Sequence, residues 1–438
     1  MAGSPGTINC VNGHPNPLEA KFCGVCGGKV EEIVELPKKQ VTFVGVGGTG
    51  INILTSIAEG YSKLETNSTS TGFLGLNAAS DEVDEPSDTS DIITYVKFGE
   101  RARKVKRSWV SGESAFLEEE SILDQLEKAG VTSSDMVMVI SAISGGTGSG
   151  VPPPVLELID RYAEAIPVKT VTALLPAVDE PDVFRFNAYC GLSRLIEYRG
   201  KSRPDMIILI GKENLMSHGD VDNEGKEMTI DRTVASILDM TSSPGSGEIY
   251  RWLEPADLVL TTRSTGVIHF VPCLALNHSL RIYQDLESVL DSALLRPLAE
   301  IDPSSALYTH IFLRVPKYLK KENSPEAITK SIYKWRKKVF PEELGGDYSI
   351  TYVEKNGDKV DALVLLGGCT MDGILRKLIE GYRTVASSLT DSRRRSAYKD
   401  LSSPSKEELG VLEVNMQEYL DHVEKVRKGQ LISKGSAS

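Results

Sequence analysis

From about residue 41 the chain alternates short, apolar, β-branched runs with longer amphipathic stretches. This alternation is typical of a parallel sheet whose strands are joined by crossover helices. Each short run ends in a glycine, proline or polar turn, so the turns should gather at one edge of the sheet, where α/β proteins bind ligands. The expected strands are residues 41–46, 72–76, 136–142, 169–175 and 206–210.

A different pattern begins after about residue 245 and predicts a second, smaller α+β domain. Helical periodicity then continues from residue 371 in two blocks, which predicts two helices packed on the outside. The strands expected in the second domain are residues 267–276, 308–315, 348–354 and 360–366, its helices are 280–298 and 325–338, and the last helix is 406–427.

The first 28 residues are rich in glycine, proline and asparagine and contain three of the six cysteines. We interpret them as a small module that precedes an α/β protein with a Rossmann-like parallel sheet. The expected divisions are the module at 1–28, a linker at 29–39, the Rossmann-like domain at 40–245, the α+β domain at 246–370 and the C-terminal helices at 371–430.

Composition narrows the class of protein. The chain has 438 residues, 40% hydrophobic and 25% charged, which is enough for several globular cores. A net charge of -12 disfavours nucleic acid as the main partner. The longest apolar runs are far shorter than the ~20 residues of a membrane span, and no leader opens the chain. Cys190, Cys273 and Cys369 lie in apolar or small-residue settings, so we expect reduced core thiols and a cytoplasmic protein.

The sharpest motif follows the expected strand at 136–142 and precedes a helical stretch that opens at 151–154. Its glycines let backbone N–H groups approach a polyphosphate, and a following helix N-terminus adds partial positive charge. A flexible loop is the alternative for such a segment in isolation. The usual P-loop motif with its lysine is absent. The motif consists of Ser144, Gly145, Gly146, Thr147, Gly148, Ser149 and Gly150.

This heptapeptide matches the tubulin signature, [SAG]-G-G-T-G-[SA]-G, at every position, and the chain resembles the tubulin/FtsZ superfamily of GTPases from about residue 40 to 430. The resemblance implies a GTP-binding domain at 40–245, with GTP or GDP and Mg²⁺ as ligands. It also implies head-to-tail polymerisation, with hydrolysis by acids that the adjacent subunit supplies. The main expected partner is therefore a second copy of the chain.

A second glycine turn, residues 45–52, follows the first expected strand. Gly45, Gly47 and Gly50 also satisfy the dinucleotide fingerprint G-x-G-x-x-G, so a nicotinamide-dependent oxidoreductase is an alternative. That alternative requires an acid after the second strand, where Asn77 stands. In the resembled family this turn covers the phosphates, and the residue at Asn52 contacts guanine.

The resemblance extends to the sugar and the base. Glu180 matches the acid that holds the ribose, and Asp231 matches the residue that reads guanine. Lys212 stands where the family has asparagine, and Glu227 stands where a stacking aromatic is usual. The expected nucleotide-binding residues are Gly47, Gly48, Thr49, Asn52, Asn77, Ser144, Gly145, Gly146, Thr147, Gly148, Ser149, Glu180, Lys212 and Asp231, with Thr147, Asn77 and Asp81 as contributors to the Mg²⁺ site.

Glu254 and Asp257 match the two acids of the family's catalytic loop. Glu254 follows Asp231 by 23 residues and precedes His269 by 15, and both intervals are those of tubulins. At three-residue spacing on a helix, two carboxylates share one face and can orient a water molecule. The alternative is structural, because Pro255 suits a first helical position and would make the two acids helix-capping residues.

Two close pairs of ligands in the N-terminal module, Cys10 with His14 and Cys23 with Cys26, suit tetrahedral Zn²⁺. Free or disulfide-paired cysteines are the alternative. The favoured function is therefore a polymer-forming GTPase whose zinc module docks a protein partner. The second is a GTP-binding scaffold that hydrolyses weakly and recruits partners through that module.

Overall fold

The computed structural model divides into two compact units, Met1–Lys38 and Lys39–Ser438. It describes residues 7–9, 14–17, 24–26, 39–61, 69–78, 92–99, 108–163, 165, 167–197, 202–222, 225–245, 247–283, 285–354, 357–390 and 404–430.

The small unit contains one antiparallel pair, β1 (Thr7–Asn9) with β2 (Pro15–Pro17). Two of the four expected zinc ligands, His14 and Cys26, lie in the described residues, whereas Cys10 and Cys23 lie outside them. Among the described residues, no group of three or more His, Cys, Asp or Glu side chains is placed to hold a metal ion. Zinc binding therefore stays a prediction.

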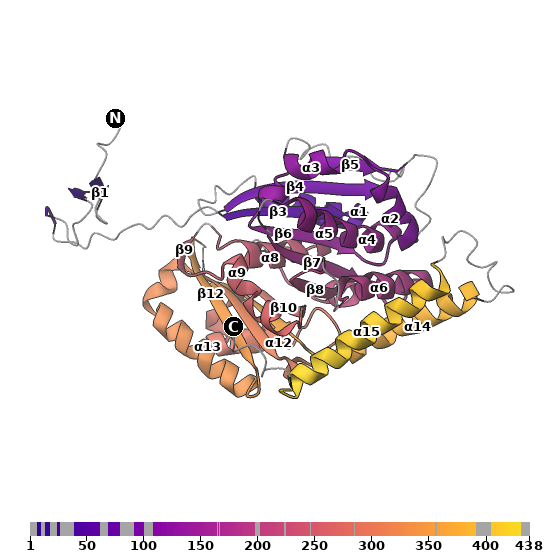
Figure 1. Cartoon of the computed structure of the whole chain (residues 1–438). Coiled ribbons are helices and arrows are strands. Elements are labelled where there is room, and N and C mark those ends of the chain that lie inside the picture. Colours follow the sequence, from indigo (N-terminus) through magenta and orange to yellow (C-terminus); the bar gives the residue numbers. More distant parts are fainter. Residues whose placement is uncertain are drawn as a thin grey trace. The chain divides into compact units, whose positions relative to one another are not determined.

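The large unit is built on an 11-stranded sheet in the order β5-β4-β3-β6-β7-β8-β10-β13-β11-β12-β9 (Figure 1). The five strands expected in the first half and the four expected in the second are all present. The strands are β3 (Lys39–Val46), β4 (Thr69–Ala78), β5 (Thr94–Phe98), β6 (Met136–Ala142), β7 (Val168–Leu175), β8 (Met206–Gly211), β9 (Glu248–Arg251), β10 (His269–Ser279), β11 (Tyr308–Pro316), β12 (Gly345–Val353) and β13 (Lys359–Gly367).

The six strands from β5 to β8 are parallel and have the order of a doubly wound fold. Residues along β7 are buried throughout, as expected for strands covered on both faces. The order reverses between β3 and β6, and right-handed crossovers in opposite directions place the following helices on opposite faces. The helices of this half are α1 (Gly47–Tyr61), α2 (Trp109–Leu117), α3 (Ile122–Lys128), α4 (Gly146–Gly150), α5 (Pro152–Tyr162), α6 (Asp182–Leu195), α7 (Lys212–Met216) and α8 (Ile230–Ser242), with a 3₁₀ turn at Val131–Ser133.

The second half continues the same sheet, because β10 pairs in parallel with β8 and antiparallel with β13. It nevertheless has a hydrophobic core of its own around Trp335. Successive β10 side chains serve both cores, Leu274 in the larger one and Ala275 in the smaller one. The sequence predicted the strands but not the continuity of the sheet.

The expected helix at 280–298 is wrong, because the structure breaks it into α11 (Leu280–Tyr283) and α12 (Leu286–Leu294). Asp285 accepts a hydrogen bond from the Ser288 backbone N–H and so starts a new helix. After α12 the chain turns back onto β10, where Leu298 N–H donates to the Pro272 carbonyl. The other elements are α9 (Pro255–Leu258), α10 (Leu260–Thr265), α13 (Pro325–Val339) and 3₁₀ turns at Pro303–Ser305 and Lys317–Lys321.

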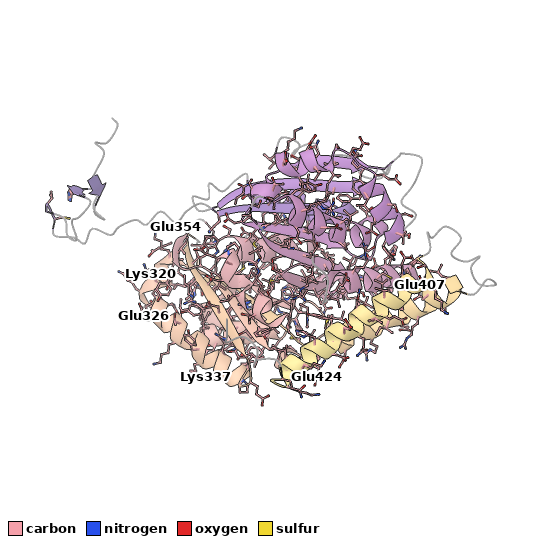
Figure 2. All side chains as sticks on the ribbon, viewed as in Figure 1. Lys320, Glu326, Lys337, Glu354, Glu407 and Glu424 are labelled. Carbon is pink, nitrogen blue, oxygen red and sulfur yellow. The ribbon has the colours of Figure 1, made fainter. Side chains whose placement is uncertain are left out.

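The two C-terminal helices, α14 (Asp372–Thr390) and α15 (Lys406–Arg427), lie alongside α6 (Figure 1). Tyr382 of α14 stacks on Phe186 of α6, and its hydroxyl donates to the Leu409 carbonyl of α15. Glu407 and Glu424 point outward near the two ends of α15 (Figure 2). The expectation of two helices packed on the outside of the sheet is thus confirmed.

The three scattered cysteines, Cys190, Cys273 and Cys369, are buried free thiols, and burial raises the pKa of each. The prediction of core thiols is confirmed. None of the helices in the described parts of the chain is long and apolar enough to cross a membrane.

We predict that Asp220→Ala destabilises the protein by about 3–5 kcal/mol, the cost of breaking a buried ion pair. Asp220 accepts from Arg296 (2.8 Å), Leu276 N–H (3.0 Å) and His218 (3.1 Å). Burial by itself raises the pKa of Asp220, but His218, the Leu276 N–H and Arg296 together lower it below its ordinary value.

Chemical denaturation measures the effect. Because the pKa of Asp220 is lowered, its stabilisation is full at neutral pH, and the gap between wild type and variant should shrink as the pH falls below about 4. Glu354→Ala is the control, since its ion pair with Lys317 is exposed and should change stability by less than ~0.5 kcal/mol. Equal loss in both variants would contradict the prediction.

Candidate functional site

The first glycine turn joins β3 directly to α1. Gly47 has a φ of +74°, in the left-handed region that favours glycine. Gly48 and Thr49 follow in the first turn of α1, and Asn52 lies one turn further along. The chain thus turns sharply at the carboxyl end of β3 and presents the start of a helix there.

The second glycine turn joins β6 to α4, and here the structure refines the expectation. The helix begins inside the motif, at Gly146, with Gly145 as its N-cap, rather than at residue 151. The N–H groups of a first helical turn have no partner within the helix and are available to a ligand. Gly148 lies so close to β6 that an added Cβ would be 2.1 Å from the Ala142 carbonyl oxygen.

Ser149 has a different place from the one expected. Its side chain is almost fully buried, and its Oγ donates to the Gly145 carbonyl at 2.5 Å. It stands outside the lining of the pocket described next and ties the N-cap to the body of the helix.

Both glycine turns open into one pocket of about 540 Å³ at the carboxyl edge of the parallel strands. Every expected nucleotide-binding residue except Ser149 lines it. These residues are Gly47, Gly48, Thr49, Asn52, Asn77, Ser144, Gly145, Gly146, Thr147, Gly148, Glu180, Lys212 and Asp231. Asp81 lies outside the described residues.

An aromatic side chain that sequence reasoning missed also lines the pocket. Phe184 comes from the first turn of α6, and Ile230 comes from the start of α8. The sequence analysis sought an aromatic one turn before Asp231 and found Glu227. The sequence shows that Phe184 lies near the start of a helix that follows the Glu180 loop, but not which way its ring is directed.

Two acids give this end of the pocket its charge. The Glu180 carboxylate binds Lys212 Nζ at 2.6 Å and accepts from the Ala177 N–H at 2.9 Å. Burial raises the pKa of Asp231. Within the described part of the chain, no donor reaches the Asp231 carboxylate, so it can accept hydrogen bonds from a ligand.

Glu254 and Asp257 lie on α9, at the opposite edge of the sheet. Glu254 is the N-cap residue of α9, but its side chain makes no capping hydrogen bond. Instead it pairs with Lys39, the first residue of β3, at 3.4 Å. Asp257 is exposed one turn further on. Glu254 therefore occupies the helix-capping position that the alternative interpretation expected, but its carboxylate does not cap the helix.

The two edges are far apart. α10 is fastened to the amino end of β8 by Arg263, which binds Asp205 at 2.7 and 3.0 Å. β3 runs from Lys39, beside Glu254, to Val46, beside the pocket, which is about 23 Å at ~3.3 Å per residue. Neither acid can reach a ligand in the pocket of its own subunit.

A second cavity, of about 690 Å³, opens at this amino edge. Three ion pairs join charged groups of its lining, Lys169 with Asp160, Arg161 with Glu157 and Arg263 with Asp205. None of the described residues in its lining is a glycine. The described lining therefore differs from the glycine turns that favour a polyphosphate in the first pocket.

A family model described as "Tubulin/FtsZ family, GTPase domain" matches residues 40–219, the segment that holds both glycine turns, Glu180 and Lys212. Residues 40–219 are a tubulin/FtsZ GTPase domain.

The relatives of this domain are cell division proteins. FtsZ 1 of Methanocaldococcus jannaschii is 31% identical over 187 residues, which are 42% of this chain and 45% of that protein. FtsZ 1 of Halobacterium salinarum is 27% identical over 289 residues, 64% of each. The chain thus spans about half to just under two thirds of the length of these curated relatives.

Solved structures extend the likeness of fold beyond the tubulin/FtsZ GTPase domain. CetZ from Methanosaeta thermophila has a TM-score of 0.61 at 19% identity, over 89% of this chain and 99% of that one. CetZ2 from Haloferax volcanii, solved as a GTPgS-bound protofilament, has a TM-score of 0.60 at 15% identity, over 80% and 100%. At these identities the likeness shows the fold alone.

The glycine geometry predicts contrasting effects of two alanine substitutions. Gly148→Ala forces its Cβ against the Ala142 carbonyl and should destabilise the protein by about 1–3 kcal/mol, the cost of overpacking a filled site. Gly145→Ala meets no atom within 4 Å and has an ordinary φ of -86°, so it should fold with stability within ~0.5 kcal/mol of wild type. Thermal unfolding of both variants checks this. Similar unfolding temperatures would show that the β6–α4 approach is looser than described.

Proposed function

We propose that this protein is a GTPase that polymerises head to tail, with GTP held at the carboxyl edge of the sheet and hydrolysed by acids of the next subunit. The observation that carries the proposal is the separation of Glu254 and Asp257 from the pocket by the length of β3. Stacking copies in one direction brings the amino edge of one subunit to the carboxyl edge of its neighbour. CetZ2, which shares the fold, was solved as a protofilament, and this supports the assembly.

The pocket accounts for the parts of GTP. Backbone N–H groups at both glycine turns face the phosphates, and Phe184 with Ile230 offers an apolar surface for the base. Asp231 can accept from guanine N1–H and the exocyclic amine, which adenine cannot supply together. When bound, Mg²⁺ would neutralise charge on the phosphates, and the Thr147 hydroxyl and the Asn77 amide oxygen would hold it.

Hydrolysis requires a water molecule in line with the bond between the γ-phosphorus and its bridging oxygen. The Glu254 and Asp257 carboxylates of the neighbour can accept hydrogen bonds from that water and orient its oxygen toward phosphorus. As the new P–O bond forms, the bond from the γ-phosphorus to the oxygen of GDP breaks, and the water passes a proton to the Glu254 carboxylate of the neighbour. Lys39 holds the Glu254 carboxylate in place at the subunit surface.

The N-terminal unit enters the proposal as a zinc module that docks a protein partner. The support is the spacing of Cys10, His14, Cys23 and Cys26. Its test is the zinc content of the purified full chain, and a metal-free folded module would overturn it. The GTP-binding scaffold with weak hydrolysis is the alternative that the next experiment separates from a GTPase.

We predict that Glu254→Gln lowers the GTP hydrolysis rate of assembled protein by about 10²–10⁴-fold, the contribution of a general acid–base group, while GTP binding is retained. Hydrolysis by wild type should rise faster than linearly with protein concentration, because the site needs two subunits. Phosphate release at several protein concentrations measures both. Glu248→Gln is the control. Glu248 lies on nearby β9 and pairs with Lys320, so its substitution should leave the rate unchanged.

Mixing two inactive variants tests the neighbour's role directly. Gly145→Asp has room for its side chain and places a negative charge against the phosphates, so it should lose GTP but keep the acids. Random copolymers of Gly145→Asp and Glu254→Gln restore an intact site at about one quarter of the interfaces, and activity should reappear. No recovery on mixing, or full activity in isolated monomers, would contradict hydrolysis between subunits. Unchanged turnover in Glu254→Gln would favour the scaffold.

We predict that Asp231→Asn weakens GTP binding by about 10- to 100-fold, because a charged acceptor is lost, and lowers the preference for GTP over ATP. Without nucleotide the variant should be slightly more stable at neutral pH. The raised pKa of Asp231 means that its ionised form costs stability, so this difference narrows as the pH falls and Asp231 is protonated. Titration calorimetry and thermal unfolding measure the two effects. Ser236→Ala, on the same helix outside the pocket, is the control, and equal losses would contradict base reading by Asp231.

A further inference from the structure

An ion pair closes one end of the nucleotide pocket. Glu180 Oε1 and Lys212 Nζ are 2.6 Å apart, and both residues line the pocket. Their side chains differ in exposure, 18% for Glu180 and 44% for Lys212. A ligand that enters this end of the pocket therefore meets an ion pair that is already formed.

The order of the strands places this pair away from the phosphates. The glycine turns follow β3 and β6, whereas Glu180 follows β7 and Lys212 follows β8. Strands lie about 4.8 Å apart, so the β8 turn is about 10 Å along the edge from the β6 turn. A triphosphate on the glycine turns therefore directs the sugar of the nucleotide toward Glu180.

Each carboxylate oxygen of Glu180 already accepts one hydrogen bond in this state. Oε1 is bound to Lys212, and Oε2 accepts from the Ala177 N–H at 2.9 Å. The Glu180 N–H also donates to the Ala177 carbonyl at 3.2 Å, which fixes the residue in its turn. Sugar hydroxyls that approach Oε1 therefore either share that oxygen with the Lys212 ammonium group or displace it.

Lys212 is the partner that can leave. Its long, half-exposed side chain can swing to solvent at small cost, whereas Glu180 is fastened by backbone bonds. The backbone at Lys212 stays in place, because the next residue, Glu213, binds Lys377 at 2.9 Å and accepts from the Val178 N–H at 3.2 Å. The pair thus has one fixed member and one movable member.

We propose that Lys212 and Glu180 form a latch that the sugar hydroxyls of the nucleotide open, so that Lys212 sets how strongly the pocket distinguishes sugars. The proposal rests on the proposed function, since it takes a nucleoside triphosphate as the ligand. A ribonucleotide displaces the ammonium group and binds Glu180. A nucleotide without sugar hydroxyls leaves the latch closed and gains nothing from Glu180.

The test compares GTP with 2′,3′-dideoxy-GTP on wild type and Lys212→Met, by titration calorimetry at concentrations below assembly. Removing the latch should tighten GTP binding by about 2- to 5-fold, the size of a partly exposed ion pair, and leave dideoxy-GTP binding unchanged. The preference for GTP over dideoxy-GTP therefore rises by the same factor. Lys212→Arg can re-form the pair and should return the preference toward wild type.

Lys317→Met is the matched control, because it removes a lysine whose ion pair, with Glu354, is exposed and lies outside the pocket lining. It should leave the preference unchanged. Equal weakening of both nucleotides in Lys212→Met would show that Lys212 only attracts phosphate charge, and an unchanged preference would show that the pair does not compete with the sugar. Either result overturns the latch. If wild type binds neither nucleotide, the proposed function fails instead.

Discussion

The common direction of six neighbouring strands is the constraint on which the rest of this structure depends. Because β3 to β8 all run the same way, every turn that follows a strand lies at one edge of the sheet, and every turn that precedes one lies at the other. The glycine turns, Glu180 and Lys212 belong to the first set. Glu254 and Asp257 sit beside the second. A protein built this way has half of its proposed site at each end.

Hydrogen bonds and strand pairing connect the pocket to the second half of the chain. The segment between Lys212 and Asp231 contains Asp220, which is buried and bonded to Arg296 and to the backbone of β10. β10 itself pairs with β8, whose end carries Lys212. The sugar and base end of the pocket is therefore connected to the second half of the chain by hydrogen bonds of the sheet and by a buried ion pair.

Local pattern predicted the parts of the molecule that depend on local sequence. Strands such as β6 have continuous apolar runs, and the glycine motifs specify turns by themselves, so both were found. β9 was missed because its four residues are mostly exposed, and its conformation depends on pairing with β12 and on the ion pair between Arg251 and Asp347. The helix expected at 280–298 failed because a cap at Asp285 and a bond to Pro272 outweigh periodicity.

The residues of the candidate site also divide into those that the sequence could place and those that it could not. Residues at the ends of strands, such as Asn77 and Lys212, could be placed by counting from the strands. Phe184 could not, because its contribution depends on how the first turn of α6 is oriented over the pocket. The pairing of Glu180 with Lys212 is also beyond sequence reasoning, since 32 residues separate them and only the adjacency of β7 and β8 brings them together.

The loop that carries the acids is held from both halves of the sheet. On one side, Arg251 binds Asp347 at 2.6 Å and lies over the Tyr348 ring, which fixes the chain three residues before Glu254. On the other side, Lys39, the first residue of β3, pairs with Glu254. A carboxylate at an N-cap normally accepts a hydrogen bond from its own helix, whereas the Glu254 carboxylate pairs with Lys39. A carboxylate held in this way keeps its position within a single copy of the chain, so the proposed assembly requires no reordering of the loop.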